Sequence, residues 1–254
     1  MIPAMISPAD IPTLRAECEA LKARIDASRP WPTAQVKSLR DWFTVAFTAQ
    51  SNGLEGNTYT ESEVRVLVQD GITVGGKTVR ETLETQNLAA VTRGLWDVAE
   101  AASPLDEKFL LNLHRAIVAG TIPDAQSGAW RTTPVFISGD DKRPPAPSAV
   151  PGLMADWFAA VNACNADALE CSAKAHYDFV KIHPFHDGNG RTARLVMNLI
   201  LVRGGWLPAI IPTAVRADYV ASLHSSRTFD DFFAFFLWQV RENLKDYVRF
   251  FEEK

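Results

Sequence analysis

Two histidines, an acid, two glycines, an asparagine and two arginines occur within twelve consecutive residues, HPFHDGNGRTAR at 183–194. Apolar, helical-looking sequence flanks this segment on both sides. Pro184 and the glycines interrupt the preceding helix, and Asn189 is of a type that caps the N-terminus of a following one. The sequence therefore predicts a tight polar loop at the start of a buried helix.

This loop has the composition of a phosphate-binding site. The glycines of DGNG let backbone N–H groups converge on an anion where the helix dipole adds positive potential. Arg191 and Arg194 lie three residues apart on one helix face and can donate to phosphate oxygens. Asp187 offers the hard oxygen ligand that Mg²⁺ prefers, and His183 titrates near neutrality, which suits a general base acting on a hydroxyl group.

The segment resembles the signature of the Fic family, His-x-Phe-x-Asp/Glu-Gly-Asn-Gly-Arg-x-x-Arg, and matches it at every fixed position. Three further segments resemble other parts of that family. Residues 71–87 resemble the segment before the core, 127–147 a β-hairpin flap with a proline-rich stretch, and 194–212 the helix and turn after the signature. The resemblance implies a mostly helical enzyme that transfers AMP from ATP to a Ser, Thr or Tyr hydroxyl of a target protein.

The resemblance also implies a role for each signature residue. His183 would take the proton from the target hydroxyl, and Asp187 would hold Mg²⁺ against the α- and β-phosphates of ATP. Arg191 would contact the phosphate tail, and Arg194 would bind the γ-phosphate. Three residues would line the anion hole: Gly188, Asn189 and Gly190.

Other positions receive secondary roles from the same resemblance. Phe185 would anchor the loop in the core, Tyr219 would lie near the adenine, and His186 would have no catalytic role. The flap would pair its backbone with the target segment as an added strand. The residues of that edge would be Val135, Phe136 and Ile137.

A second stretch, SNGLEGN at 51–57, resembles the inhibitory motif Ser/Thr-x-x-x-Glu-Gly/Asn of the family class whose inhibitory helix precedes the core. Ser51 and Glu55 are four residues apart on one helix face, and Gly56 permits the helix to end. The implied contact is an ion pair from Glu55 to Arg194 that occupies the γ-phosphate site. Because this glutamate helps to remove AMP in some relatives, reverse deAMPylation stays open.

A P-loop is one rival interpretation, because GITVGGKT at 71–78 matches GxxxxGK[ST]. The spacing Thr60-x-x-Glu63 is a capping box, which predicts a helix and not a strand before Gly71. No alternating strand–helix pattern surrounds the segment. These features argue against a P-loop ATPase.

Further alternatives concern the chemistry. His183, His186 and Asp187, with His176 upstream, could ligate zinc or iron in a hydrolase, but Pro184 interrupts the pair and the glycines and arginines would have no role. A non-enzymatic nucleotide sensor, or half of a toxin–antitoxin pair, would bind ATP without transferring AMP. A related enzyme could transfer UMP, phosphocholine or phosphate.

The composition fits an ordinary globular protein of 254 residues, with 47% hydrophobic and 22% charged residues. A net charge of −4 without any Lys/Arg run argues against a nucleic-acid partner. No signal peptide and no apolar run of roughly 18–20 residues is found, which argues against a membrane. An odd count of three cysteines without a CxxC pair predicts reduced cysteines and a cytoplasmic location. Large apolar faces are compatible with a homodimer.

The elements that must position the loop follow from apolar periodicity and helix caps. The expected fold class is all-α with a small β-hairpin flap, whose strand candidate is 131–137. We expect an N-terminal helical extension at 1–50 and a Fic core at 51–250. That core includes an inhibitory helix at about 44–57, a flap at about 130–140 and the signature loop at 183–194. Helices are predicted at 8–28, 33–50, 61–69, 78–100, 105–119, 150–162, 168–182, 189–204, 216–226 and 229–250.

Overall fold

The computed structural model describes residues 6–137 and 142–252. Within these ranges the chain is built from helices, and no β strand occurs. The α-helices are α1 (Ile11–Ala27), α2 (Thr33–Gly53), α3 (Glu61–Arg65), α4 (Val79–Arg93), α5 (Leu95–Glu100), α6 (Glu107–Val118), α7 (Val150–Asn162), α8 (Ala168–Ile182), α9 (Asn189–Arg203), α10 (Arg216–Leu223) and α11 (Phe229–Glu252). The expected all-α class is confirmed.

Two predicted helices differ from those observed. The predicted helix at 78–100 is two helices, α4 and α5, which meet at Gly94, a residue with low helix propensity. The predicted helix at 61–69 begins with the expected capping box at Thr60 and continues from α3 into a π-helical turn, η2 (Val66–Asp70). Gly71, in the left-handed conformation with φ 70°, ends it.

The predicted strand at 131–137 is wrong. The chain bends at Thr132 and Thr133 and forms no strand, and the backbone N–H of Arg131 donates to the carbonyl of Pro184 in the signature loop at 2.9 Å. The β-propensity of this segment is therefore overridden by a tertiary contact. The rest of the expected flap, at 138–140, lies outside the described residues.

Helix α9 occupies the centre of the fold and carries the second half of the signature. Its sequence LVMNLILV is apolar on nearly all sides, as expected for a helix without a solvent face. Leu195, Val196 and Leu199 are buried against α5 and α8. Each such side chain stabilises the fold by about 1.5–3 kcal/mol relative to an exposed one. This packing fixes the helix N-terminus where the signature loop ends.

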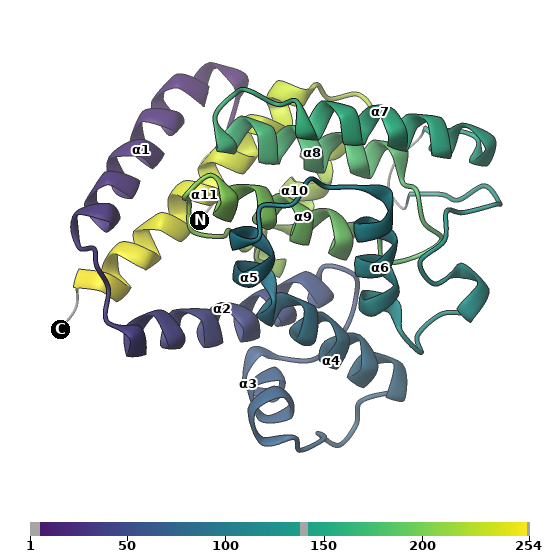
Figure 1. Ribbon diagram of the computed structural model, residues 1–254, viewed down its shortest axis with the longest axis horizontal. Helices are drawn as coiled ribbons and strands as arrows, with labels where there is room; N and C mark the ends of the chain where they lie inside the picture. Colours follow the sequence, from purple (N-terminus) through teal and green to yellow (C-terminus); the bar gives the residue numbers. More distant parts are fainter. Residues whose placement is uncertain (1–5, 138–141, 253–254) are drawn as a thin grey trace.

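The N-terminal helix α1 lies along the C-terminal helix α11 on one side of the molecule (Figure 1). Leu14, Cys18 and Ile25 form the buried stripe of α1. Helix α2 runs without a break through positions 50 and 51, where we divide the extension from the core. That division stays a prediction. None of the described helices combines the length and the apolar character that crossing a bilayer requires.

One expectation about the cysteines is wrong. Cys164 and Cys171 form a disulfide across the short turn between α7 and α8, where the two Cα atoms lie 6.0 Å apart. This pair could not be predicted from the sequence, because a spacing of seven residues is not a known redox or metal-binding pattern. Cys18 is free and buried as expected, and burial raises the pKa of its thiol to about 12.

Candidate functional site

Two residues in the left-handed conformation shape the signature loop. His183 ends α8 with φ 51° and ψ 60°, and Gly188 precedes α9 with φ 76°. A Cβ added at Gly188 would lie 2.8 Å from Val118 Cγ1, so this position requires glycine for both its φ and its surroundings. The loop is thus folded tightly at the N-terminus of a buried helix, as predicted.

Asn189 does not cap the helix, contrary to our prediction. Gly188 holds the N-cap position, and Asn189 is the first residue of α9. The Asn189 amide instead accepts from Phe185 N–H and donates to Phe185 C=O, both at 2.9 Å. The asparagine therefore closes the loop on itself and leaves the backbone at the helix N-terminus uncapped by a side chain.

Phe185 and His114, a histidine that our prediction did not include, pack against each other beneath the signature loop. Phe185 is buried, as expected of a core anchor, and its ring stacks on that of His114 with centroids 3.6 Å apart. His114 Nδ1 accepts from Gly128 N–H, so Nε2 carries the proton and donates to Asp187 C=O at 2.9 Å. Burial lowers the pKa of His114 to about 4, which keeps the ring neutral. A histidine on the apolar face of α6 was the only sequence sign of this contact.

His183 has the geometry of a general base. Its Nδ1 lies 3.3 Å from Val180 C=O, and since a carbonyl only accepts, Nδ1 carries the proton and Nε2 keeps a free lone pair. Burial lowers the pKa of His183 below its ordinary value. The ring is therefore neutral and able to accept a proton at neutral pH.

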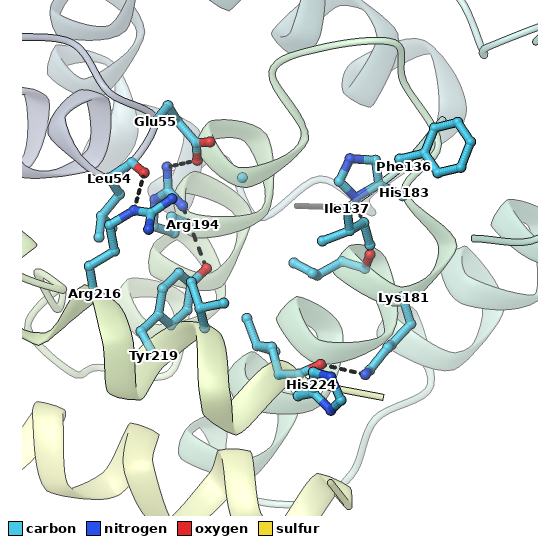
Figure 2. A pocket seen from close by; sticks show the side chains of 14 residues that line it. Leu54, Glu55, Phe136, Ile137, Lys181, His183, Arg194, Arg216, Tyr219 and His224 are labelled. Atoms are coloured by element: carbon cyan, nitrogen blue, oxygen red, sulfur yellow. Dashed lines mark hydrogen bonds and ion pairs between the residues drawn. The ribbon is translucent and has the colours of Figure 1, made fainter. Parts of the chain in front are cut away.

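His183 lines a cavity of about 260 Å³ together with Glu55, Gly190, Arg194 and Tyr219. Figure 2 shows His183 beside the flap residues on one side of this cavity and the Glu55–Arg194 pair on the other. The structure thus brings together residues from the turn after α2, the end of α8, α9 and α10 that are far apart in the sequence.

Arg194 is buried and is held by the predicted inhibitory segment. Its Nη2 donates to Glu55 Oε1 at 2.7 Å and to Ser51 C=O at 2.8 Å, and its Nε donates to Ser51 Oγ at 2.9 Å. Helix α2 ends at Gly53, so Glu55 lies in the following turn, and Gly56 leaves it with φ 96°. The expected ion pair between Glu55 and Arg194 is present, and Ser51 adds two hydrogen bonds to Arg194 that we did not predict.

Tyr219 contacts Arg194 from the side opposite Glu55 (Figure 2). Its hydroxyl lies 3.5 Å from Arg194 Nη1 and 2.9 Å from His176 Nε2, and burial raises its pKa, so it stays neutral. Val220 and Leu223 of the same helix also line the cavity. Arg216, at the start of this helix, lines the cavity as well, so the wall combines apolar side chains with a hydroxyl group and a cation.

Asp187 is half-buried and surrounded by donors. Its Oδ1 accepts from Gly188 N–H at 2.6 Å and lies 3.4 Å from Arg191 Nη2, and its Oδ2 accepts from the exposed Arg80 at 2.6 Å. The buried carboxylate of Glu84 joins Arg80 and Arg191 from α4. The sequence did not predict the roles of Arg80 and Glu84. Among the described residues no cluster of three or more His, Cys, Asp or Glu side chains could hold a metal ion, so a Mg²⁺ ion at Asp187 would need further oxygen ligands, such as substrate phosphates.

The segment that matches a P-loop has a different role. Lys77 Nζ donates to Thr58 C=O at 2.6 Å and pairs with Glu63 at 2.9 Å. Thr78 caps α4 in a capping box with Glu81, and a π-helical turn, not a strand, precedes Gly71. The segment connects helices, and the P-loop interpretation is excluded.

Two of the three expected target-docking residues, Phe136 and Ile137, line the cavity. Ile137 lines the cavity with His183, and the Phe136 ring is 71% exposed, with the Arg143 guanidinium 4.8 Å from its centroid. Val135 precedes Phe136 in the chain and is not among the residues that line the cavity. An exposed aromatic ring beside the base offers a surface for a second protein.

His186 faces the flap and not the cavity. Its Nε2 accepts from the Thr132 backbone N–H at 3.3 Å. This contact between the signature loop and the flap agrees with a structural role for the variable position of the signature.

Comparison with known proteins agrees with this geometry. The chain is 34% identical over 199 residues to the protein adenylyltransferase fic-1 of Caenorhabditis briggsae, covering 76% of this chain and 38% of that protein. It is 37% identical over 183 residues to the protein adenylyltransferase Fic of Nematostella vectensis, covering 69% and 42%. The chain therefore spans about two fifths of the length of these curated relatives.

Solved structures show the same fold. A Fic-1 fragment from Caenorhabditis elegans superposes with a TM-score of 0.83 at 27% identity, covering 95% of this chain and 73% of that one. A Fic-domain signalling protein from Bacteroides thetaiotaomicron superposes with a TM-score of 0.85 at 24% identity, covering 94% and 98%. The model of the Fic/DOC family matches residues 104–201, which include the signature loop. This chain carries a Fic/DOC family domain.

Proposed function

We propose that this chain is a protein adenylyltransferase, which transfers AMP from ATP to a Ser, Thr or Tyr hydroxyl of a target protein. We further propose that Glu55 restrains this activity. The relatives described above are named for protein adenylyl transfer, and three signature residues of this chain, His183, Gly190 and Arg194, line one cavity.

The observation that carries the proposal is the Glu55–Arg194 ion pair at the helix N-terminus. Arg194 is a buried cation, and the Glu55 carboxylate lies against Gly190 in the same cavity as His183. A carboxylate is an anion with two acceptor oxygens, so its position marks a site built for negative charge. The terminal phosphate of a nucleotide is the anion that this site would hold once Glu55 leaves.

The reaction follows from the placement of these groups. The target hydroxyl oxygen attacks the α-phosphorus, forming an O–P bond, while the bond from that phosphorus to the bridging oxygen breaks and pyrophosphate leaves. His183 Nε2 accepts the hydroxyl proton. Arg191, Arg194 and the backbone N–H groups at the start of α9 stabilise charge on the phosphate oxygens. Tyr219 and its neighbours offer the apolar wall for the base.

Asp187, in the signature loop, is the residue that would hold Mg²⁺. The ion would neutralise charge on the phosphates that Arg194 and the helix N-terminus also contact. The exposed Arg80 side chain pairs with the same carboxylate, and a bound Mg²⁺ ion would displace it.

Other parts of the prediction remain to be tested. They are a cytoplasmic location, homodimer formation and the lack of a nucleic-acid partner. Because the Cys164–Cys171 pair is oxidised, the expectation of a reducing compartment has lost one of its supports.

The test uses α-³²P-ATP with Mg²⁺ and four proteins, alone and with host lysate. They are the wild type, Glu55→Gly, Glu55→Gly/His183→Ala and Glu55→Gly/Lys77→Ala. We expect strong labelling of protein by Glu55→Gly, weak labelling by wild type, and none once His183 is replaced. Lys77 is the matched control because it belongs to the excluded P-loop pattern and holds only the 58–63 segment.

The alternatives give different results. ATP binding without any labelling, in every variant, would support a nucleotide sensor. Labelling that appears only with UTP or CDP-choline would indicate transfer of another group.

A further inference from the structure

One buried side chain outside the signature contacts the backbone on which the proposed base is carried. The Nε of Arg131 donates to His183 C=O at 2.8 Å, and one Nη2 hydrogen faces Ile182 C=O at 3.5 Å. The backbone N–H of the same residue donates to Pro184 C=O at 2.9 Å. Arg131 thus contacts three consecutive carbonyls around the end of α8.

The same guanidinium also holds both ends of the proposed target-docking segment. Its Nη1 donates to Thr133 C=O at 3.4 Å, and its Nη2 donates to Pro145 C=O at 2.5 Å. Residues 133–137 leave this point toward the cavity mouth, and the chain returns to it at Pro145. One planar group therefore fixes the flap and the catalytic loop relative to each other.

Burying the Arg131 guanidinium costs more free energy than filling the same space with an apolar side chain would. Arg131 is 2% exposed, and each acceptor described for its guanidinium is a backbone carbonyl and not a carboxylate. A buried cation without an ion-pair partner loses hydration, and an apolar side chain of similar size would fill the space at lower cost. The rigid fork of an arginine is suited to holding several carbonyls in fixed directions, which a lysine cannot do.

One of the residues that Arg131 contacts, His183, has an uncommon backbone conformation. His183 has φ 51°, an uncommon conformation for a residue with a Cβ, and such residues persist where surrounding contacts determine them. The direction of its carbonyl and the direction of its ring are set by the same backbone. A second tie is the Thr132 N–H, which donates to His186 Nε2 at 3.3 Å.

We propose that Arg131 is a positioning residue that aligns the His183 base with the target-docking segment. It acts through the carbonyls of His183, Thr133 and Pro145, with His186 as a weaker second tie. The inference rests on the proposed adenylyl transfer for its consequence in catalysis, but the positioning of His183 can be measured without any transfer.

The experiment compares Arg131→Lys with Arg203→Lys, both in the Glu55→Gly background. Arg203 is a matched control because it also donates to a backbone carbonyl, that of Val98, at the opposite end of α9 from the cavity. The first readout is the labelling rate with saturating target and the Kd of ATP. The second is the NMR titration of the His183 Cε1–H signal without nucleotide, assigned by its loss in His183→Ala.

For Arg131→Lys we expect the labelling rate to fall about 10²-fold, as for a displacement near 1 Å, while the Kd of ATP changes less than about threefold. We expect the His183 signal to move and its pKa to rise toward the ordinary value, because the loop is less enclosed. Arg203→Lys should change neither readout, and His186→Ala should change both in the same direction by a smaller amount.

A His183 signal and a labelling rate in Arg131→Lys equal to those of Arg203→Lys would overturn the inference. If the Glu55→Gly parent labels nothing, the proposed function fails, and the NMR titration alone decides whether Arg131 positions His183. If Arg131→Lys does not fold, His186→Ala decides by the same two readouts.

Discussion

The Glu55 carboxylate lies directly against Gly190, 2.7 Å from Arg194 Nη2. A Cβ added at Gly190 would collide with Glu55 Oε1. An anion can approach the start of α9 only if position 190 has no side chain. The acidic side chain of Glu55, from the turn after α2, covers this position. A carboxylate and a phosphate cannot both occupy this space.

This competition predicts the effect of removing one charge. Glu55→Gln keeps the shape of the side chain but lowers its attraction to Arg194, since a charge-assisted hydrogen bond becomes a neutral acceptor. We expect the Kd of ATP to fall at least about threefold, equal to about 0.7 kcal/mol. Calorimetry of ATP binding measures this. Glu100→Gln, an exposed substitution at the end of α5, is the control and should leave the Kd unchanged.

The state of His183 predicts the pH dependence of transfer. Burial lowers its pKa below the ordinary value of about 6.5, and the base must be neutral to accept a proton. The labelling rate of Glu55→Gly should therefore rise with pH below about 6.5 and be level from there to pH 8. A rise centred at or above pH 7 would argue against His183 as the base.

The tight loop predicts a difference between two glycines. Gly188 and Gly205 both have positive φ, 76° and 77°, but only a Cβ at Gly188 meets a neighbour, Val118 Cγ1. Gly205→Ala should cost about 1–2 kcal/mol from the left-handed conformation alone. Gly188→Ala should cost at least about 1 kcal/mol more, because the core must also shift. Urea unfolding of both variants measures the difference, and equal losses would contradict the close contact.

The elements and the signature were predictable because their signals are local. Periodic apolar residues give helices such as α8 and α9, and capping residues such as Thr60 and Thr78 mark helix starts. The contacts of Arg131 with residues about fifty positions away were not predictable, since hydrogen bonds between distant segments leave no periodic pattern. The same contacts explain why 131–137, with its strand-like composition, forms no strand.

The predicted hydrogen-bond partner of Asn189 was also wrong, because the fold of the loop decides that partner. Asn189 was expected to cap α9, because its type and place fit that role. In the folded loop its amide reaches Phe185, four residues back, and both bonds depend on the left-handed Gly188. A residue type predicts that a side chain will bond to nearby backbone, but the turn geometry decides which backbone.

The last prediction concerns stability and His176, the buried neighbour of Tyr219. Burial, followed by the charge of Arg194, lowers the pKa of His176 to about 3, against about 6.5 in the unfolded chain. Between these values the unfolded chain binds a proton that the folded protein excludes. The contribution of His176 is therefore fully present above pH 6.5 and is lost as the pH falls toward 3.

The size of this loss follows from the same pKa values. Between pH 7.5 and pH 5.0 it amounts to about 2 kcal/mol, since each pKa unit corresponds to about 1.4 kcal/mol. The control is His176→Gln, whose amide can still bond to the Tyr219 hydroxyl but does not titrate. Between the two pH values we expect the free energy of unfolding of the wild type to fall by about this amount more than that of the control. The other histidines whose pKa burial lowers, His114 and His183, contribute equally to both proteins and cancel in the comparison. Urea unfolding at the two pH values measures the difference, and parallel losses in the two proteins would show that His176 is not held neutral by the fold.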